Sequence, residues 1–148
     1  MIINRAQYTI HISENVLSIL EKFKQNKFQN ESGGIILGSV YKNNSIYINK
    51  VSLPTKFDKS SRNTFDRDKK IAQIIVDFEY YNSKGEIIYL GEWHTHPEKN
   101  PLPSYVDTKM IKQQYKENKI NEDFLILLIQ GTESLYVSLY DGNAIIDR

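Results

Sequence analysis

The 148-residue sequence contains no cysteine, a single tryptophan and no long hydrophobic run. Without cysteine there can be no disulfide bond, thiol nucleophile or thiolate metal site, so a bound metal ion would need histidine, aspartate or glutamate ligands. The longest apolar runs, at 35–38, 74–76 and 124–129, are far shorter than the ~20 residues of a membrane helix. The first ten residues also lack the apolar core of a signal peptide. We therefore expect a cytoplasmic protein without a membrane partner.

A strong charge of either sign is also missing, because 19 lysines and arginines balance 18 acidic residues. Such a chain has no general field to attract nucleic acid, which we do not expect as a partner. The length suits one domain, and no repeat or linker divides the sequence, so we predict a single domain over residues 1–148. Four lysines fall on one predicted helix face, which we interpret as solvated: Lys109, Lys112, Lys116 and Lys119.

The hydrophobic pattern predicts about three helices and six strands. The predicted helices cover 13–27, with Ser13 as N-cap, 65–81 and 104–118. The predicted strands cover 33–40, 45–53, a segment from Ile87 to the histidines, 124–130, 134–140 and 144–146. Because the strands are grouped early and late instead of alternating with helices, the pattern indicates an α+β fold.

The middle of the chain gives two further local predictions. Residues 54–64 are polar and unpatterned, which predicts a surface loop. The following helix carries apolar residues at helical spacing, which predicts one buried face. Its members are Ile71, Ile74, Ile75, Phe78 and Tyr81.

Two histidines, His94 and His96, stand two positions apart near the end of a predicted strand. Alternate strand residues point to the same side, so both imidazoles can contact one ion. Pro97 then ends the strand, because proline has no N–H for the sheet. Taken alone, however, a histidine on a strand is more often an ordinary polar residue than a ligand.

After seven intervening residues comes Ser104, and Asp107 follows three positions later at the start of a predicted helix. Alone, this pair indicates no more than a helix cap. Two imidazoles and one carboxylate, however, form a known ligand set for catalytic zinc, with the fourth position left to water. Zinc lowers the pKa of such a water towards ~7, and the chemistry then needs a base to accept the proton.

Together these residues resemble the metal signature of the JAMM (MPN-plus) metallopeptidases. The segment 31–38, ESGGIILG, has Glu31 before a glycine-containing apolar strand and resembles that family's upstream motif. The resemblance spans roughly 13–140. It implies a mixed β-sheet flanked by about three helices, of the cytidine-deaminase-like type. It also implies a role for each motif residue: His94, His96 and Asp107 as zinc ligands, Glu31 as general acid/base, and Ser104 as the hydroxyl that stabilises the oxyanion.

Two other glutamates compete with Glu31 for the role of base. Glu92 shares the face of both histidines on an ideal strand, and its alternative interpretation is a partner that orients an imidazole or a strand-edge charge. Glu98 follows Pro97 in a loop and is interpreted as solvated. The resemblance favours Glu31 over both.

The resemblance also suggests a substrate. JAMM domains cleave peptide or isopeptide bonds, commonly after the C-terminal tail of ubiquitin or a ubiquitin-like protein, and residues 54–66 and 97–103 would flank such a tail. A compact, cysteine-free chain with the sequence GEWHTHP at 91–97 resembles the bacterial branch of the JAMM family. That branch includes deubiquitinase-like isopeptidases of antiphage (CBASS) operons. Two alternatives stay open: a zinc hydrolase that processes a sulfur carrier, and a non-catalytic MPN scaffold.

Overall fold

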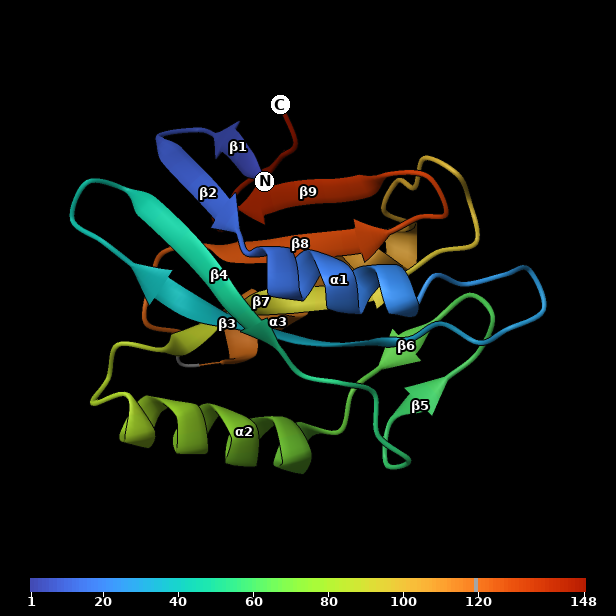
Figure 1. Ribbon diagram of the computed structural model, residues 1–148, viewed down its shortest axis with the longest axis horizontal. Coiled ribbons are helices and arrows are strands. Elements are labelled where there is room, and N and C mark those ends of the chain that lie inside the picture. Colours follow the sequence, from blue (N-terminus) through green and yellow to red (C-terminus); the bar gives the residue numbers. More distant parts are fainter. Residues whose placement is uncertain (119) are drawn as a thin grey trace.

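The computed structural model describes residues 1–118 and 120–148, and most of its strands join one eight-stranded sheet. These strands are β1 (Ile2–Arg5), β2 (Tyr8–Ile12), β3 (Gly33–Val40), β4 (Ser45–Val51), β7 (Ile88–Thr95), β8 (Leu125–Gln130), β9 (Leu135–Tyr140) and β10 (Ile145–Ile146). Their order across the sheet is β1-β2-β4-β3-β7-β8-β9-β10 (Figure 1). The pairs β2/β4 and β7/β8 are parallel and the others are antiparallel, so the sheet is mixed.

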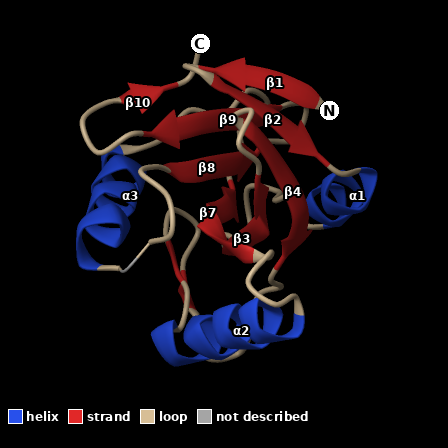
Figure 2. Cartoon of the chain, turned by 90° about the vertical axis from the view of Figure 1, so that its left-hand side faces the viewer, coloured by secondary structure: helices blue, strands red, loops and turns tan. Residues whose placement is uncertain are grey.

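Three helices flank this sheet, which confirms the predicted fold class. Helix α1 (Glu14–Lys22) lies on one face and α3 (Tyr105–Glu117) on the opposite one, while α2 (Lys69–Asn82) packs near β3 and β7 (Figure 2). The central strand β8 is buried along its whole length. Its side chains alternate between the core under α1 and the core under α3. A strand covered on both faces has no solvent side, which explains the unbroken apolar run at 124–129.

The first helix is shorter than the predicted 13–27. Ser13 is its N-cap, as predicted, and accepts a hydrogen bond from the backbone of Val16 at 3.2 Å. The helix ends at Lys22, and the Phe23 ring turns to pack against Trp93 with 5.8 Å between ring centroids. The next residues form no helix, and the Gln25 side-chain amide donates to the backbone carbonyls of Gln29 and Arg62.

The start of the second predicted helix is also corrected. Phe65 belongs to β6 (Phe65–Asp66), which pairs with β5 (Lys59–Ser60) in a small separate hairpin. Helix α2 begins only at Lys69, where the Asp68 side chain accepts a hydrogen bond from the Ile71 backbone at 2.9 Å. The predicted surface loop 54–64 therefore contains half of a hairpin, whose strands are too short to show a period.

The predicted buried face of α2 is wrong for three of its five members. Ile74, Phe78 and Tyr81 are 64%, 62% and 85% exposed. The helix rests on the sheet through Ala72, with Ile75 and Val76 partly buried against the apolar cluster formed with β3. Spacing alone identified an apolar stripe, but only one side of that stripe faces the sheet.

Strands β1 and β2 were not predicted. Their turn contains Ala6 with φ 51°, so no glycine or asparagine marks it in the sequence. The hairpin is held by pairing of β2 with β4 and by burial of Ile10 and Ile12 under α1. It extends the sheet beyond the six predicted strands.

Two predictions about the molecular surface can also be compared with the structure. Three of the predicted solvated lysines, Lys109, Lys112 and Lys116, are exposed, whereas Lys119 lies outside the described residues. Over residues 1–118 and 120–148, no helix has the length and apolar character required to span a membrane.

Candidate metal centre

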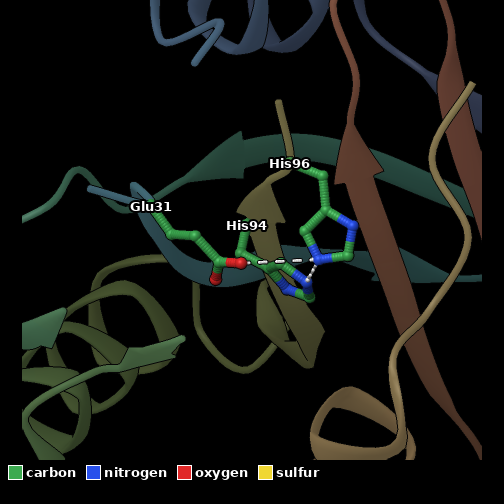
Figure 3. Close-up of side chains that lie close together, drawn as sticks. All are labelled: Glu31, His94 and His96. Atoms are coloured by element: carbon green, nitrogen blue, oxygen red, sulfur yellow. Dashed lines mark hydrogen bonds and ion pairs between the residues drawn. The ribbon is translucent and has the colours of Figure 1, made fainter. Parts of the chain in front are cut away.

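The two histidines are fixed by the middle of the sheet. β7 lies between β3 and β8, so His94 faces Gly33 on one side and Ile129 on the other. The His96 backbone N–H, just beyond the strand, donates to the Gln130 carbonyl at 3.0 Å. Both imidazoles are buried, and their Nε2 atoms are 3.2 Å apart (Figure 3).

Helix α3 presents its first turn to these rings. The Ser104 N–H donates to Asp107 Oδ2 at 2.8 Å, and the Asp107 N–H donates to Ser104 Oγ at 3.1 Å, which completes a capping box. The same carboxylate lies against both imidazoles, with Oδ1 3.2 Å from His94 Nε2 and Oδ2 3.1 Å from His96 Nε2. Asp107 is thus held by the cap while it contacts the histidines.

The spacing of these donor atoms suits a tetrahedral metal ion. Ligands about 2.0–2.1 Å from such an ion lie about 3.3 Å from one another. The two Nε2 atoms are 3.2 Å apart, and each has a different Asp107 oxygen beside it, Oδ1 at 3.2 Å from His94 and Oδ2 at 3.1 Å from His96. When both Nε2 atoms are unprotonated, their lone pairs face each other at this distance, and a shared cation would satisfy both. The structure therefore brings the three predicted ligands together in an arrangement that can hold a metal.

Glu31 is the second carboxylate at this centre. Its Oε1 lies 3.5 Å from His96 Nε2, and its Oε2 is buried without a hydrogen-bond partner among the described residues. Figure 3 shows the Glu31 side chain pointing towards the rings of His94 and His96. Glu31, His94 and His96 place their donor atoms within 4.8 Å of one another, so they too could hold an ion. Asp107 contacts both rings and Glu31 only one, which favours Asp107 as the third ligand.

The two carboxylates differ in electrostatic environment. Burial raises the pKa of the Glu31 carboxyl to about 8; the attraction of His96 opposes this effect, and the negative charges of Asp107 and Glu98 add to it. Burial would also raise the pKa of Asp107, but hydrogen bonds from His94 and His96 hold it well below its usual range. In the metal-free protein, Asp107 is therefore the anion that pairs with the histidines, and Glu31 is the carboxyl that can hold a proton near neutral pH.

Glu92 neither orients an imidazole nor lies at a strand edge, which were the two alternatives to a role as base. It is buried and bound by Arg67, whose Nε and Nη2 lie 3.0 and 2.8 Å from its Oε1. Tyr89 donates a further hydrogen bond to the same oxygen at 2.7 Å. Its carboxylate is occupied by these partners, and within the described chain Glu92 makes no hydrogen bond to an imidazole. It also lies on β7, which is paired on both sides, so it is not an edge charge.

The other two predicted residues lie at the rim. Glu98 is exposed, as predicted, with Oε2 3.7 Å from His96 Nδ1. This separation is too long for a hydrogen bond. The Ser104 hydroxyl accepts the Asp107 N–H, and in the described part of the chain no acceptor takes its own proton. That O–H is therefore free to donate to a ligand.

Sequence reasoning missed three residues around the centre. Arg67 is the cation for Glu92, and Gln25 and Thr95 form a buried hydrogen bond at 2.9 Å. Gln25 and Thr95 are 70 positions apart, and no motif links them. A buried glutamate on a central strand needs a cationic partner. The sequence contains 19 lysines and arginines, and nothing in it shows which of them pairs with Glu92.

Comparison with known proteins gives the family. The sequence matches the family described as prokaryotic homologs of the JAB domain over residues 13–140, and the chain belongs to this family. It is similar to the CD-NTase/cGAS isopeptidase of Pseudomonas aeruginosa, with 33% identity over 138 residues, 90% of this chain and 84% of that protein. The protein of the same name from Escherichia coli is 31% identical over 127 residues, covering 85% and 78%.

Two further proteins are similar to this chain, one in sequence and one in fold. A probable metalloprotease, y4qB, of Sinorhizobium fredii is 27% identical over 128 residues, covering 84% of this chain and 78% of that protein. The solution structure of protein DSY2949 from Desulfitobacterium hafniense superposes with a TM-score of 0.65 at 17% identity, covering 94% and 89% of the two chains. At that identity the superposition supports the fold alone.

Proposed function

We propose that this protein is a zinc metallopeptidase that cleaves isopeptide bonds in protein conjugates. The observation that carries the proposal is the cluster of His94, His96 and Asp107, in which the two Nε2 atoms are 3.2 Å apart and an Asp107 carboxylate oxygen lies 3.1–3.2 Å from each of them. Neutral imidazoles and a carboxylate are the usual donors at catalytic zinc sites, where one position stays open for water. Family membership and the similarity to isopeptidases and a probable metalloprotease support the same class of reaction.

Each motif residue then has a proposed task. His94, His96 and Asp107 would hold zinc, which when bound lowers the pKa of water and polarises a carbonyl. Glu31 would take the proton from the attacking water and return it to the leaving amine. Its burial and its free Oε2 suit this task, because the carboxyl can exchange a proton without first breaking a hydrogen bond within the described chain.

Ser104 would stabilise the negative charge that develops on the carbonyl oxygen of the substrate. Its hydroxyl oxygen accepts the Asp107 N–H, and its own O–H has no acceptor within the described chain, so it can donate to a bound substrate. A donor fixed in this way stabilises a developing oxyanion without reorganising during the reaction. The capping box therefore positions a ligand and an oxyanion donor through one local structure.

The proposed substrate is a protein conjugate joined through the C-terminal tail of a ubiquitin-like protein or of an enzyme conjugated in the same way. The relatives' name, CD-NTase/cGAS isopeptidase, supports a nucleotidyltransferase as that enzyme. The sequence resemblance to the isopeptidases of CBASS operons leads us to propose a role in bacterial antiphage defence. The β5–β6 hairpin contacts the Glu31 backbone, and residues 97–103 follow the histidines, so these segments are proposed to flank the tail. An extended tail can be held there by backbone hydrogen bonds.

The test is cleavage of a defined conjugate by zinc-loaded protein. A nucleotidyltransferase joined through its C-terminal carboxyl to a lysine of a target protein is the substrate, and band shifts on a gel give the rate. We expect Glu31→Gln to keep zinc and to lower the rate ~10²–10⁴-fold, the usual contribution of a general base. The exposed Glu14→Gln serves as the matched control and should cleave normally. An intact conjugate after incubation with zinc-loaded wild type, or full activity of Glu31→Gln, would contradict the proposal.

A further inference from the structure

One buried amide, that of Gln25, connects the segments around the metal centre. Its Nε2 donates to the Gln29 carbonyl at 2.9 Å and to the Arg62 carbonyl at 3.1 Å. Its Oε1 accepts the hydroxyl proton of Thr95 at 2.9 Å. Both N–H groups and the carbonyl of this side chain are therefore used, although the residue is only 2% exposed. A fully satisfied buried amide holds its partners in one arrangement.

Thr95 carries this link to the residue next to Glu31. It lies between the two histidines, and because side chains alternate along a strand, its hydroxyl points away from the metal centre. That hydroxyl accepts the Ser32 N–H at 3.0 Å, while the Thr95 N–H donates to the Ser32 carbonyl at 2.9 Å. Both backbone groups of Ser32 are thus bound by one residue of the histidine strand.

A second link reaches Glu31 from the β5–β6 hairpin. The Glu31 N–H donates to the Ser61 carbonyl at 2.8 Å, and the neighbouring Arg62 carbonyl is the one that accepts from Gln25. The Gln25 amide therefore ties together residues 29–32, the histidine strand and the hairpin turn. These three segments surround the Glu31 backbone.

The Glu31 carboxylate has little to hold it by itself. Its Oε2 has no hydrogen-bond partner in the described chain, and its Oε1 is 3.5 Å from the nearest imidazole nitrogen. Its place at the centre therefore depends on where its backbone is fixed. That position is set by Ser32, Ser61 and the amide that joins their neighbours.

We propose that Gln25 is a positioning residue that holds Glu31 at the metal centre, acting through Thr95 and through the Arg62 carbonyl. This inference rests on the proposed role of Glu31 as the general acid/base. Gln25 itself makes no hydrogen bond to a candidate ligand among the described residues. Because a misplacement of about 1 Å can reduce a rate ~10²-fold, loss of this amide should lower kcat more than it changes KM.

The main variant is Gln25→Met, which keeps the length of the side chain and removes its polar atoms. We expect kcat to fall ~10–100-fold with KM within about threefold and zinc content unchanged. Backbone hydrogen exchange at Glu31 and Ser32 should become at least about tenfold faster, since these amides lose the arrangement that protects them. This second readout does not depend on activity. Wild-type kcat together with unchanged exchange at both amides would overturn the inference.

A matched pair at Thr95 repeats the test if Gln25→Met does not fold. Thr95→Val keeps the shape and removes the hydroxyl, whereas Thr95→Ser keeps the hydroxyl. Thr95→Val should show the same loss of kcat and the same faster exchange, and Thr95→Ser should restore both. Equal effects of the two substitutions would overturn the inference, because they would trace the loss to packing.

The double variant Gln25→Met/Glu31→Gln separates this inference from the proposed function. If Gln25 acts through Glu31, the double variant should be no slower than Glu31→Gln alone. A further loss of the full Gln25→Met size would overturn the positioning role. Full activity of Glu31→Gln would instead refute the proposed function, and the exchange rates at Glu31 and Ser32 would still decide whether Gln25 positions this segment.

Discussion

Replacing Arg67 by methionine should lower the free energy of unfolding by about 3–5 kcal/mol, the usual result of leaving a buried charge without its partner. The Arg67 and Glu92 side chains are only 13% and 4% exposed, and two guanidinium nitrogens lie 2.8–3.0 Å from one carboxylate oxygen. After the substitution, Tyr89 would be the remaining donor to Glu92 in the described chain. One hydroxyl does not compensate for a buried negative charge.

Urea unfolding followed by circular dichroism measures this loss. For a chain of this size each kcal/mol corresponds to roughly 2–4 °C, so Tm should fall by roughly 6–20 °C. The double variant Arg67→Met/Glu92→Leu should recover most of the loss, because it leaves neither charge in the interior. Lys50→Met, which breaks the exposed pair with Glu79, is the control and should change stability by less than ~1 kcal/mol.

The result that would refute this reasoning is a loss below about 1 kcal/mol for Arg67→Met, or a double variant no more stable than the single one. Either outcome would mean that the Glu92 carboxylate is not held as a buried anion. The double variant also bears on catalysis. Retained cleavage without the Glu92 carboxylate would exclude it as the base.

Three further predictions concern the sheet and the site. Gly91→Ala should destabilise the protein by more than ~3 kcal/mol, as judged by Tm, because φ is 152° and a Cβ would lie 1.9 Å from the Ile126 carbonyl oxygen. In metal-free protein the raised pKa of Glu31, about 8, should make stability fall as pH rises from about 4.5 to 8, since only the unfolded chain is then ionised at this group. Glu31→Gln should remove that part of the slope in urea unfolding at pH 5.5 and 8.5; an identical slope would contradict the assignment. Removing zinc with a chelator should lower Tm, by an amount equivalent to ~4 kcal/mol at a free zinc concentration a thousand times Kd, and should leave the Tm of Asp107→Ala unchanged.

Much of the fold followed from the sequence because its signals are local. The apolar run at 124–129 and the hairpin turns after it predicted the last strands, and the Ser13 cap predicted the start of α1. The candidate ligands could also be predicted from the sequence. Alternation along the strand places His94 and His96 on one side, and the capped first turn of a helix fixes the position of Asp107. The structure adds that the Asp107 carboxylate lies against both imidazoles.

The remaining features depend on contacts between distant segments. Nothing local could show that α2 rests on Ala72 and leaves Phe78 exposed, because the orientation of a helix is decided by the surface it packs on. The fold brings Arg67, which lies between β6 and α2, to Glu92, and it brings Thr95 of β7 to Gln25. Buried polar side chains are often of this kind, since any donor that the topology delivers can satisfy them.

Zinc content of purified variants tests the central claim most directly. Wild-type protein should bind about one zinc ion per chain, as a site with two imidazoles and a carboxylate does. Asp107→Ala should lose at least ~100-fold in zinc affinity, more than the loss of an outer partner causes, while Glu31→Gln should bind zinc as tightly as wild type. Wild-type affinity in Asp107→Ala combined with lost binding in Glu31→Gln would contradict the account, because Glu31 would then be the third ligand.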